Sequence, residues 1–168
     1  MKFEIETDLT SEDYATYNKH LFNKGKLKKY ILFSVIMSLV LPYIITDYKQ
    51  PRLSEFIISF IVFNSIFIGY LYYRLGKTKN IPMRDGTTLG KRKYILQDNE
   101  FICEKANAES KIKWSGIKSM DVTSKAIYLF VDTNQAFIIP KRSFADIQAQ
   151  NEFLETVNRK IKDSNVNG

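Results

Sequence analysis

The chain has 168 residues, of which 45% are hydrophobic, and 25 Lys and Arg stand against 18 Asp and Glu to give a formal charge of +7. This length allows one ordinary domain and an appendage. The single cysteine, Cys103, excludes an internal disulfide and fits no cysteine-based metal site. A basic balance suits nucleic acid or the anionic face of a membrane, so the positions of the cations matter.

Residues 1–29 predict a cytoplasmic strand followed by a helix. Phe3 and Ile5 alternate with charged neighbours, which is the pattern of a strand with one buried face. Thr10 and Asp13 then form a capping-box-like pair at the start of a helix. Because the opening MKFEIETD is charged and alternating, we expect no cleaved signal peptide.

Two uncharged apolar runs, residues 30–46 and 56–73, predict transmembrane helices. They lie at the short end of the range of about 17–25 residues that spans a bilayer. A soluble chain of this size has no room to surround two helices that are apolar on every face. Polar residues inside the runs can hydrogen-bond between the helices; they are Ser34, Ser38, Asn64 and Ser65.

Lysines and arginines precede the first run and follow the second, whereas the loop at 47–55 carries two charges of each sign. Short segments rich in Lys and Arg stay in the cytoplasm. We therefore predict a multi-pass protein of the bacterial cytoplasmic (inner) membrane, with both termini in the cytoplasm and the loop outside. Neither run contains an acidic, basic or histidine residue that would mark an ion pathway.

The remaining sequence predicts a linker at 74–90, a cytoplasmic β module with a C-terminal helix at 91–163, and a frayed tail at 164–168. Alternating runs indicate short strands at 93–97, 100–104, 108–114, 116–122, 126–131 and 136–140. The N-terminal strand could add a seventh. From Ser143 the spacing becomes helical, with an apolar stripe of Phe144, Ile147, Leu154, Val157 and Ile161.

These elements predict an α+β membrane protein. A two-helix transmembrane hairpin is inserted before a small antiparallel β-barrel or sheet, which ends in an amphipathic C-terminal helix. The order of elements matches a pleckstrin-homology-like barrel. That analogy concerns the fold alone, because such folds support many functions.

The junction at Lys141 and Arg142 has two interpretations. In the first, Pro140 ends a strand and Ser143 begins the helix, with Asp146 completing a capping-box-like pattern. In the second, the two cations bind a ligand. Together with Lys111 and Lys113 they would form a basic surface for anionic lipid or for an acidic segment of a partner protein.

Catalytic and metal-binding patterns are missing from the sequence. It contains no G-x-S-x-G or H-E-x-x-H, and the stretch RDGTTLGKRK lacks the spacing of a phosphate-binding loop. We therefore predict no enzyme activity, no catalytic residue, no metal site and no cofactor. Because many cations lie beside the apolar runs and not on one face with exposed aromatics, we also predict no nucleic-acid binding.

Four motifs give the chain a resemblance to a known family. They are D-Y-x-x-Y at 13–17, I-K-W-S-G-I at 112–117, I-Y-L-F at 127–130 and F-I-I-P-K-R-S-F at 137–144. With this order of elements, nearly the whole chain resembles the YcxB-like family of bacterial membrane proteins. The resemblance implies location and layout, and it supplies no catalytic residue.

The resulting hypothesis is a non-enzymatic, two-span membrane protein that presents a cytosolic YcxB-like binding module to a protein partner or to anionic lipid. An alternative is a structural or regulatory subunit of a membrane complex, which the hairpin assembles, including as a homo-oligomer. A further alternative is an enzyme whose site is completed by another chain.

Overall fold

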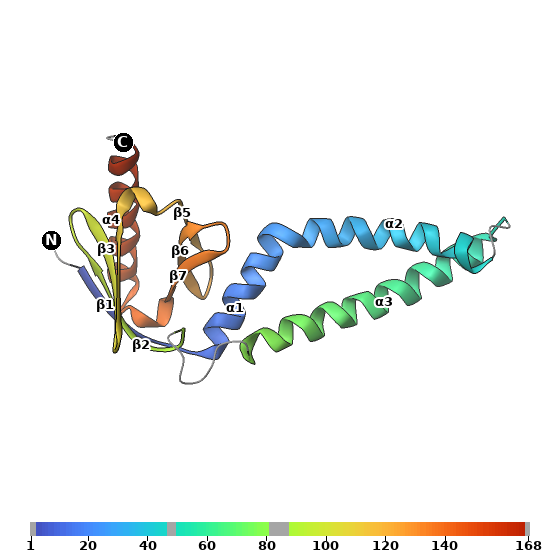
Figure 1. Cartoon of the computed structure of the whole chain (residues 1–168), viewed down its shortest axis with the longest axis horizontal. Coiled ribbons are helices and arrows are strands. Elements are labelled where there is room, and N and C mark those ends of the chain that lie inside the picture. The colour runs from blue at the N-terminus through green and yellow to red at the C-terminus, as the bar shows by residue number, and fades with distance from the viewer. Residues whose placement is uncertain (1–2, 47–49, 81–87, 167–168) are drawn as a thin grey trace. The chain divides into compact units, whose positions relative to one another are not determined.

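A computed structural model describes residues 3–46, 50–80 and 88–166 (Figure 1). The chain divides into two compact units. Met1–Tyr14 and Pro82–Gly168 form the first, here called the β module, and Ala15–Ile81 form the second, here called the helical hairpin. The architecture is α+β, with two long apolar helices, antiparallel sheets and a C-terminal helix.

The first sheet of the β module has four antiparallel strands in chain order, β1-β2-β3-β4. The strands are β1 (Phe3–Leu9), β2 (Gly90–Leu96), β3 (Glu100–Lys105) and β4 (Ala108–Lys113). Strand β1 pairs with β2 along its whole length, with Phe3 opposite Leu96 and Leu9 opposite Gly90. The seventh strand anticipated from the sequence is therefore present, although residues 10–89 separate it from its partner.

The second sheet has three antiparallel strands in the order β5-β6-β7. They are β5 (Ser119–Val122), β6 (Ala126–Asp132) and β7 (Gln135–Pro140). A 3-10 turn, η3 (Trp114–Gly116), interrupts the chain between β4 and β5. In the described part of the chain no strand pairing joins the two sheets, so the predicted strands form separate sheets and not a closed barrel.

Both sheets contribute side chains to one hydrophobic core. Tyr94, Phe101 and Ile127 are fully buried there, and the ring centroids of Phe101 and Phe137 lie 4.9 Å apart. The Tyr94 hydroxyl donates a hydrogen bond of 2.8 Å to the carbonyl of Ile138, which ties the first sheet to the second. Such a bond satisfies a buried polar group while leaving the ring in the core.

The C-terminal helix α4 (Ile147–Val166) begins later than the sequence indicated. The Ser143 side chain does not cap it, because Ser143 lies in a 3-10 turn, η4 (Lys141–Ser143), and its hydroxyl donates to Thr7 Oγ1. The Asp146 carboxylate accepts from the Ala149 N–H at 2.7 Å instead and is the cap.

The apolar stripe of α4 differs from the expected one at two positions, since Ile147 is exposed and Phe153, which the prediction omitted, is buried. Phe153 and Val157, four residues apart, are fully buried, and Phe144 packs against Phe153. Ile147 remains 64% exposed. Its inclusion in the stripe was wrong because the helix only begins at this residue, and the first fully buried side chain of the helix is that of Phe153.

The second unit is a pair of long helices. Helix α1 (Ser11–Leu21) continues through a π-helical turn, η1 (Phe22–Lys26), into α2 (Leu27–Ile45), and α3 (Leu53–Lys77) is followed by a short 3-10 turn, η2 (Thr78–Asn80). Both predicted apolar runs lie inside these helices. Parts of the predicted loop and linker, residues 47–49 and 81–87, fall outside the described residues.

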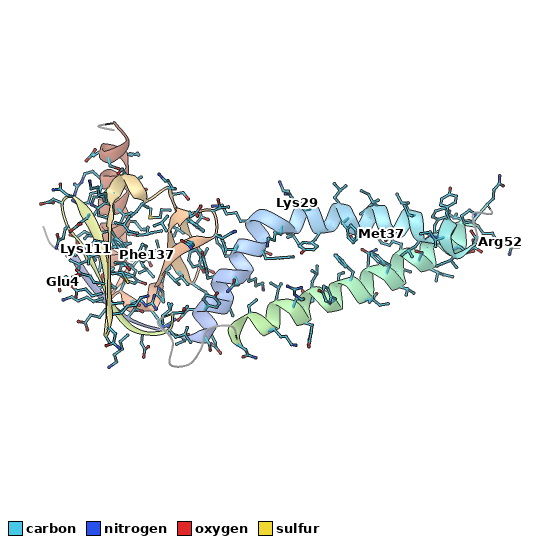
Figure 2. The ribbon with its side chains drawn as sticks, in the orientation of Figure 1. Glu4, Lys29, Met37, Arg52, Lys111 and Phe137 are labelled. Carbon is cyan, nitrogen blue, oxygen red and sulfur yellow. The ribbon has the colours of Figure 1, made fainter. Side chains whose placement is uncertain are left out.

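Helices α2 and α3 are each long and apolar enough to cross a membrane. A core helix of a soluble protein can pass the same test, but such a helix is mostly buried. Here only 17% and 6% of the two apolar windows are buried. Large apolar side chains of both helices are exposed, among them Ile36 and Leu39 of α2 and Ile58 of α3, and Figure 2 shows side chains standing out along the hairpin, such as that of Lys29.

A face of small side chains lets α2 and α3 approach each other. Ser34, Ser38 and Pro42 recur every four residues on α2 and are buried. Asn64 of α3 donates a hydrogen bond of 2.9 Å from Nδ2 to Ser38 Oγ. Of the four polar residues expected to be able to bond between the helices, Ser38 and Asn64 do so. The Ser34 and Ser65 hydroxyls donate instead to Ile31 and Ile61 of their own helices.

Candidate functional site

The guanidinium of Arg142 is bound inside the β module. Its Nη1 and Nη2 donate to the two carboxylate oxygens of Asp13 at 2.6 and 2.5 Å, and Nη2 also donates to the carbonyl of Asp8 at 3.1 Å. This two-point geometry is the strong form of an arginine–carboxylate pair. It connects the turn after β7 to the end of β1 and to the first turn of α1.

This contact affects the hydrogen bonding and the pKa of Asp13. Its side chain is only 11% exposed, and Oδ2 also accepts from the backbone N–H and the hydroxyl of Thr10, each at 2.8 Å. Burial by itself would raise the pKa of Asp13, but the hydrogen bonds from Arg142 and Thr10 outweigh it and hold the pKa below its ordinary value. The capping pair of Thr10 and Asp13 is thus confirmed.

The four predicted binding cations are not brought together. Lys141 is half-buried and follows β7 beside Arg142. Lys111 and Lys113 lie on β4, and Lys111 pairs with Glu109 at 3.1 Å. Since β4 and β1 are opposite edges of the first sheet, and Arg142 contacts residues at the end of β1, the two pairs are separated by the width of that sheet.

The outer face of the first sheet, the face opposite the core, gathers charges of both signs. Its side chains come from every second residue of each strand, and they include the buried Ile95 and Ile102 at its centre as well as charged residues. Strand register sets Glu6 opposite Lys93, Lys93 opposite Glu104 and Asp8 opposite Lys91. The charged members of this face are Glu4, Glu6, Asp8, Lys91, Lys93, Glu100, Glu104, Glu109, Lys111 and Lys113.

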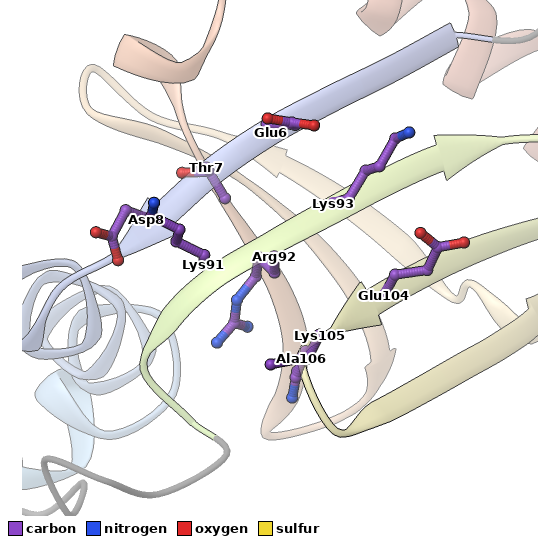
Figure 3. A pocket seen from close by; sticks show the side chains of 9 residues that line it. All are labelled: Glu6, Thr7, Asp8, Lys91, Arg92, Lys93, Glu104, Lys105 and Ala106. Carbon is purple, nitrogen blue, oxygen red and sulfur yellow. The ribbon is translucent and has the colours of Figure 1, made fainter.

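An open groove of about 560 Å³ occupies one end of this sheet. Figure 3 shows Glu6 and Asp8 on β1, Lys91 and Lys93 on β2, and Glu104 on β3 around it. Thr7 and Arg92 line it as well, together with Lys105 at the end of β3 and Ala106 in the turn that follows. Sequence reasoning missed this groove because the pairing of β1 with β2 was needed to assemble it.

The described residues offer little chemistry for catalysis or metal binding near the groove. Burial raises the pKa of the Cys103 thiol, which keeps it protonated and weakly nucleophilic. Burial also raises the pKa of Tyr94. Within the described ranges, no three His, Cys, Asp or Glu side chains gather as a metal ion would require. The predictions of no enzyme activity and no cofactor stay predictions.

Comparison with protein families finds a match for a segment in the second half of the chain. A family model described as YcxB-like protein matches residues 96–157. This segment is a YcxB-like domain. It runs from the last residue of β2 into α4 and includes the I-K-W-S-G-I, I-Y-L-F and F-I-I-P-K-R-S-F motifs. No curated protein and no solved structure matches the chain.

The YcxB-like domain provides only part of the groove. Glu104, Lys105 and Ala106 belong to the matched segment, whereas the lining residues of β1 and β2 lie before it. The groove therefore forms where the YcxB-like domain meets the strands that flank the helical hairpin.

Proposed function

We propose that this chain is a non-enzymatic, two-span membrane protein whose β module binds a protein partner through the charged groove. The YcxB-like domain would supply one wall of the binding surface, and the helical hairpin would hold it at the cytoplasmic face of the membrane. The observation that carries the proposal is the mixed-charge outer face of the first sheet, with the groove cut into it.

The pairing of β1 with β2 supports a hairpin that crosses the membrane twice. Strand β1 precedes both apolar helices and β2 follows them, yet the two strands pair over seven residues. A membrane between them would prevent this pairing. An even number of crossings therefore suits the fold, and the lysines and arginines at both ends favour the cytoplasmic side.

The charges of the outer face favour a protein partner over anionic lipid for the β module. Six carboxylates and four ammonium groups lie on it, which leaves a net charge of −2. Such a face is repelled by an anionic membrane surface, which attracts clustered cations. Arg142 is already occupied by Asp13, which removes one cation from the predicted basic surface. The groove itself is lined by three carboxylates and four cations, so a partner segment with charges of both signs would complement it.

Photo-crosslinking in native membranes tests the proposal. A photoreactive amino acid replaces Lys91 in the groove of the full-length chain, and a matched variant carries it at Lys125, an exposed lysine before β6. We expect a discrete protein adduct from position 91 that is absent from position 125. Adding Lys93→Glu should weaken the adduct, because it reverses a charge in the groove.

Other results of this experiment would contradict the proposal. Identical adducts from positions 91 and 125 would mean that the crosslinked protein does not bind specifically at the groove. An adduct with lipid would assign the groove to the membrane surface, and an adduct of twice the chain mass would favour assembly of the chain with itself.

A further inference from the structure

A second cavity, of about 500 Å³, lies within the helical hairpin between α2 and α3. It extends from the region of the Ser38–Asn64 hydrogen bond toward the start of α2 and the end of α3, where the two helices diverge (Figure 1). A volume of this size is typical of sites for small ligands. Apolar side chains that line it include Leu27, Ile31, Phe60, Phe67, Leu71 and Leu75.

Near the Ser38–Asn64 bond, the polar side chains of the cavity wall are engaged with the hairpin itself, whereas the other polar lining residues, Asn23, Tyr30 and Tyr72, lie toward the start of α2 and the end of α3. The Ser34 hydroxyl donates to the carbonyl of Ile31 at 2.9 Å. The amide nitrogen of Asn64 donates both to Ser38 Oγ and to the carbonyl of Phe60, at 2.9 and 2.7 Å. With these donors satisfied, the wall offers mainly hydrocarbon contacts, which suit an acyl chain better than a polar ligand.

Positive charge is confined to one end of this cavity. Of the described residues that line it, Lys19 alone is charged, and its side chain is exposed. The sequence around it has no Asp or Glu in 15–46 or in 56–81. The same two segments contain the cations Lys19, Lys24, Lys26, Lys28, Lys29, Arg74, Lys77 and Lys79.

We infer that the cavity binds an anionic phospholipid, with one acyl chain between α2 and α3 and the phosphate beside Lys19. Apolar walls that lead to a single lysine match a ligand that is hydrocarbon at one end and anionic at the other. Cations without neighbouring carboxylates attract such headgroups and are indifferent to neutral ones. This inference rests on the membrane insertion contained in the proposed function, and not on the groove of the β module.

Native mass spectrometry of the full-length chain tests the inference. The chain is first shown to resist alkaline carbonate extraction from membranes, and is then purified in mild detergent containing equal amounts of phosphatidylglycerol and phosphatidylcholine. We expect the monomer to retain one phosphatidylglycerol in preference to phosphatidylcholine. Lys19→Gln should lower the retained fraction about fivefold, as expected for one lysine near a headgroup. Lys28→Gln, outside the lining, should have a much smaller effect.

A second pair of variants tests the cavity without changing its charge. Leu71→Trp fills the space between the helices, whereas Ile61→Trp adds the same bulk at a 60% exposed position of α3 outside the lining. We expect the first to abolish retention of phosphatidylglycerol and the second to leave it unchanged. Lys19→Gln keeps the inference testable if Leu71→Trp fails to fold, because Lys19 is exposed.

Three results would overturn the inference. They are equal retention of the two lipids, retention that survives both Lys19→Gln and Leu71→Trp, and a lipid-free dimer in which a second copy fills the cavity. Release of the wild-type chain by carbonate would instead remove the membrane anchor of the proposed function. A chain that stays in the membrane without lipid selectivity would refute the lipid site alone.

Discussion

At the scale of single residues, Arg142 has an internal structural role. Its guanidinium fits the carboxylate of Asp13 with two hydrogen bonds and reaches the carbonyl of Asp8 with a third contact. Asp13 sits in the first turn of α1, so Arg142 holds the start of that helix to the β module. Lys141 beside it makes no comparable side-chain contact among the described residues.

We expect Arg142→Ala to lower the free energy of unfolding of the β module by about 1–2 kcal/mol, because the largely buried Asp13 carboxylate loses a charged partner whose own side chain is 53% exposed. The matched variant Lys141→Ala should change it by less than about 0.5 kcal/mol. Denaturant titration of the full chain, followed by fluorescence of the single tryptophan, Trp114, in the core, measures both. Equal effects would contradict the structural role of Arg142.

The stabilising effect of this pair should depend on pH. Since the pKa of folded Asp13 lies below its ordinary value of 3.8, ionised Asp13 stabilises the folded state above that value, and this contribution is lost as the pH falls through the folded pKa. The difference in stability between wild type and Arg142→Ala should therefore be constant near neutral pH and shrink below about pH 4. A difference that grows on acidification would contradict this assignment.

The sequence indicated local contacts correctly, but it did not show which distant residues the fold brings together. Thr10 and Asp13 were recognisable as a cap because capping is a local pattern. The contact between Asp13 and Arg142 was not, because 128 residues lie between them and no local pattern encodes it. Lys111 and Arg142 look alike as surface cations, and only the strand order separates them.

At the scale of elements, α4 shows how a helix can be predicted correctly in kind but not in detail. Its apolar periodicity was visible, yet the start was placed at Ser143, whose hydroxyl is bound to Thr7. The true cap, Asp146, looked like the partner in a capping box. The alternation of the strands was equally visible in the sequence. It did not reveal the 3-10 turn that begins at Trp114, where the chain leaves the first sheet and enters the second.

The difference in burial between Phe153 and Ile147 of α4 leads to a prediction for two variants. Phe153→Ala should lower the free energy of unfolding by about 3–5 kcal/mol, because a fully buried ring is removed from the core and leaves a cavity. Ile147→Ala, in the first turn at 64% exposure, should cost less than about 0.5 kcal/mol. The same Trp114 titration compares the two variants. A large loss from Ile147→Ala would mean that the first turn is packed in solution.

At the scale of the whole molecule, the chain combines a YcxB-like domain with a pair of apolar helices and an N-terminal strand. Residues 3–9 and 90–96 form one antiparallel ladder, although the entire hairpin is inserted between them. The outer face beside that ladder carries charges of both signs, whereas the start of α2 and the end of α3 carry cations alone. This division of charge suits a β module that binds a protein while its helices contact anionic lipid.

Topology mapping tests the orientation. A reporter fused after Pro51, in the segment between α2 and α3, should show the signal of the outer side, and one fused after residue 168 should show the signal of the cytoplasm. The lysines and arginines at both hairpin ends give the physical reason. A cytoplasmic signal from both fusions would contradict a hairpin that crosses the membrane.

The ladder between β1 and β2 also has a consequence for synthesis at the ribosome. Strand β1 emerges first but has no neighbour until β2 has been translated more than eighty residues later. In the interval the edge of β1 is unpaired, and both apolar helices must be inserted into the membrane. If only one helix were inserted, β1 and β2 would lie on opposite sides of the bilayer and could not pair. Completion of the sheet would then report that the hairpin had been inserted correctly, and a failed insertion would leave an incomplete sheet for proteases to recognise.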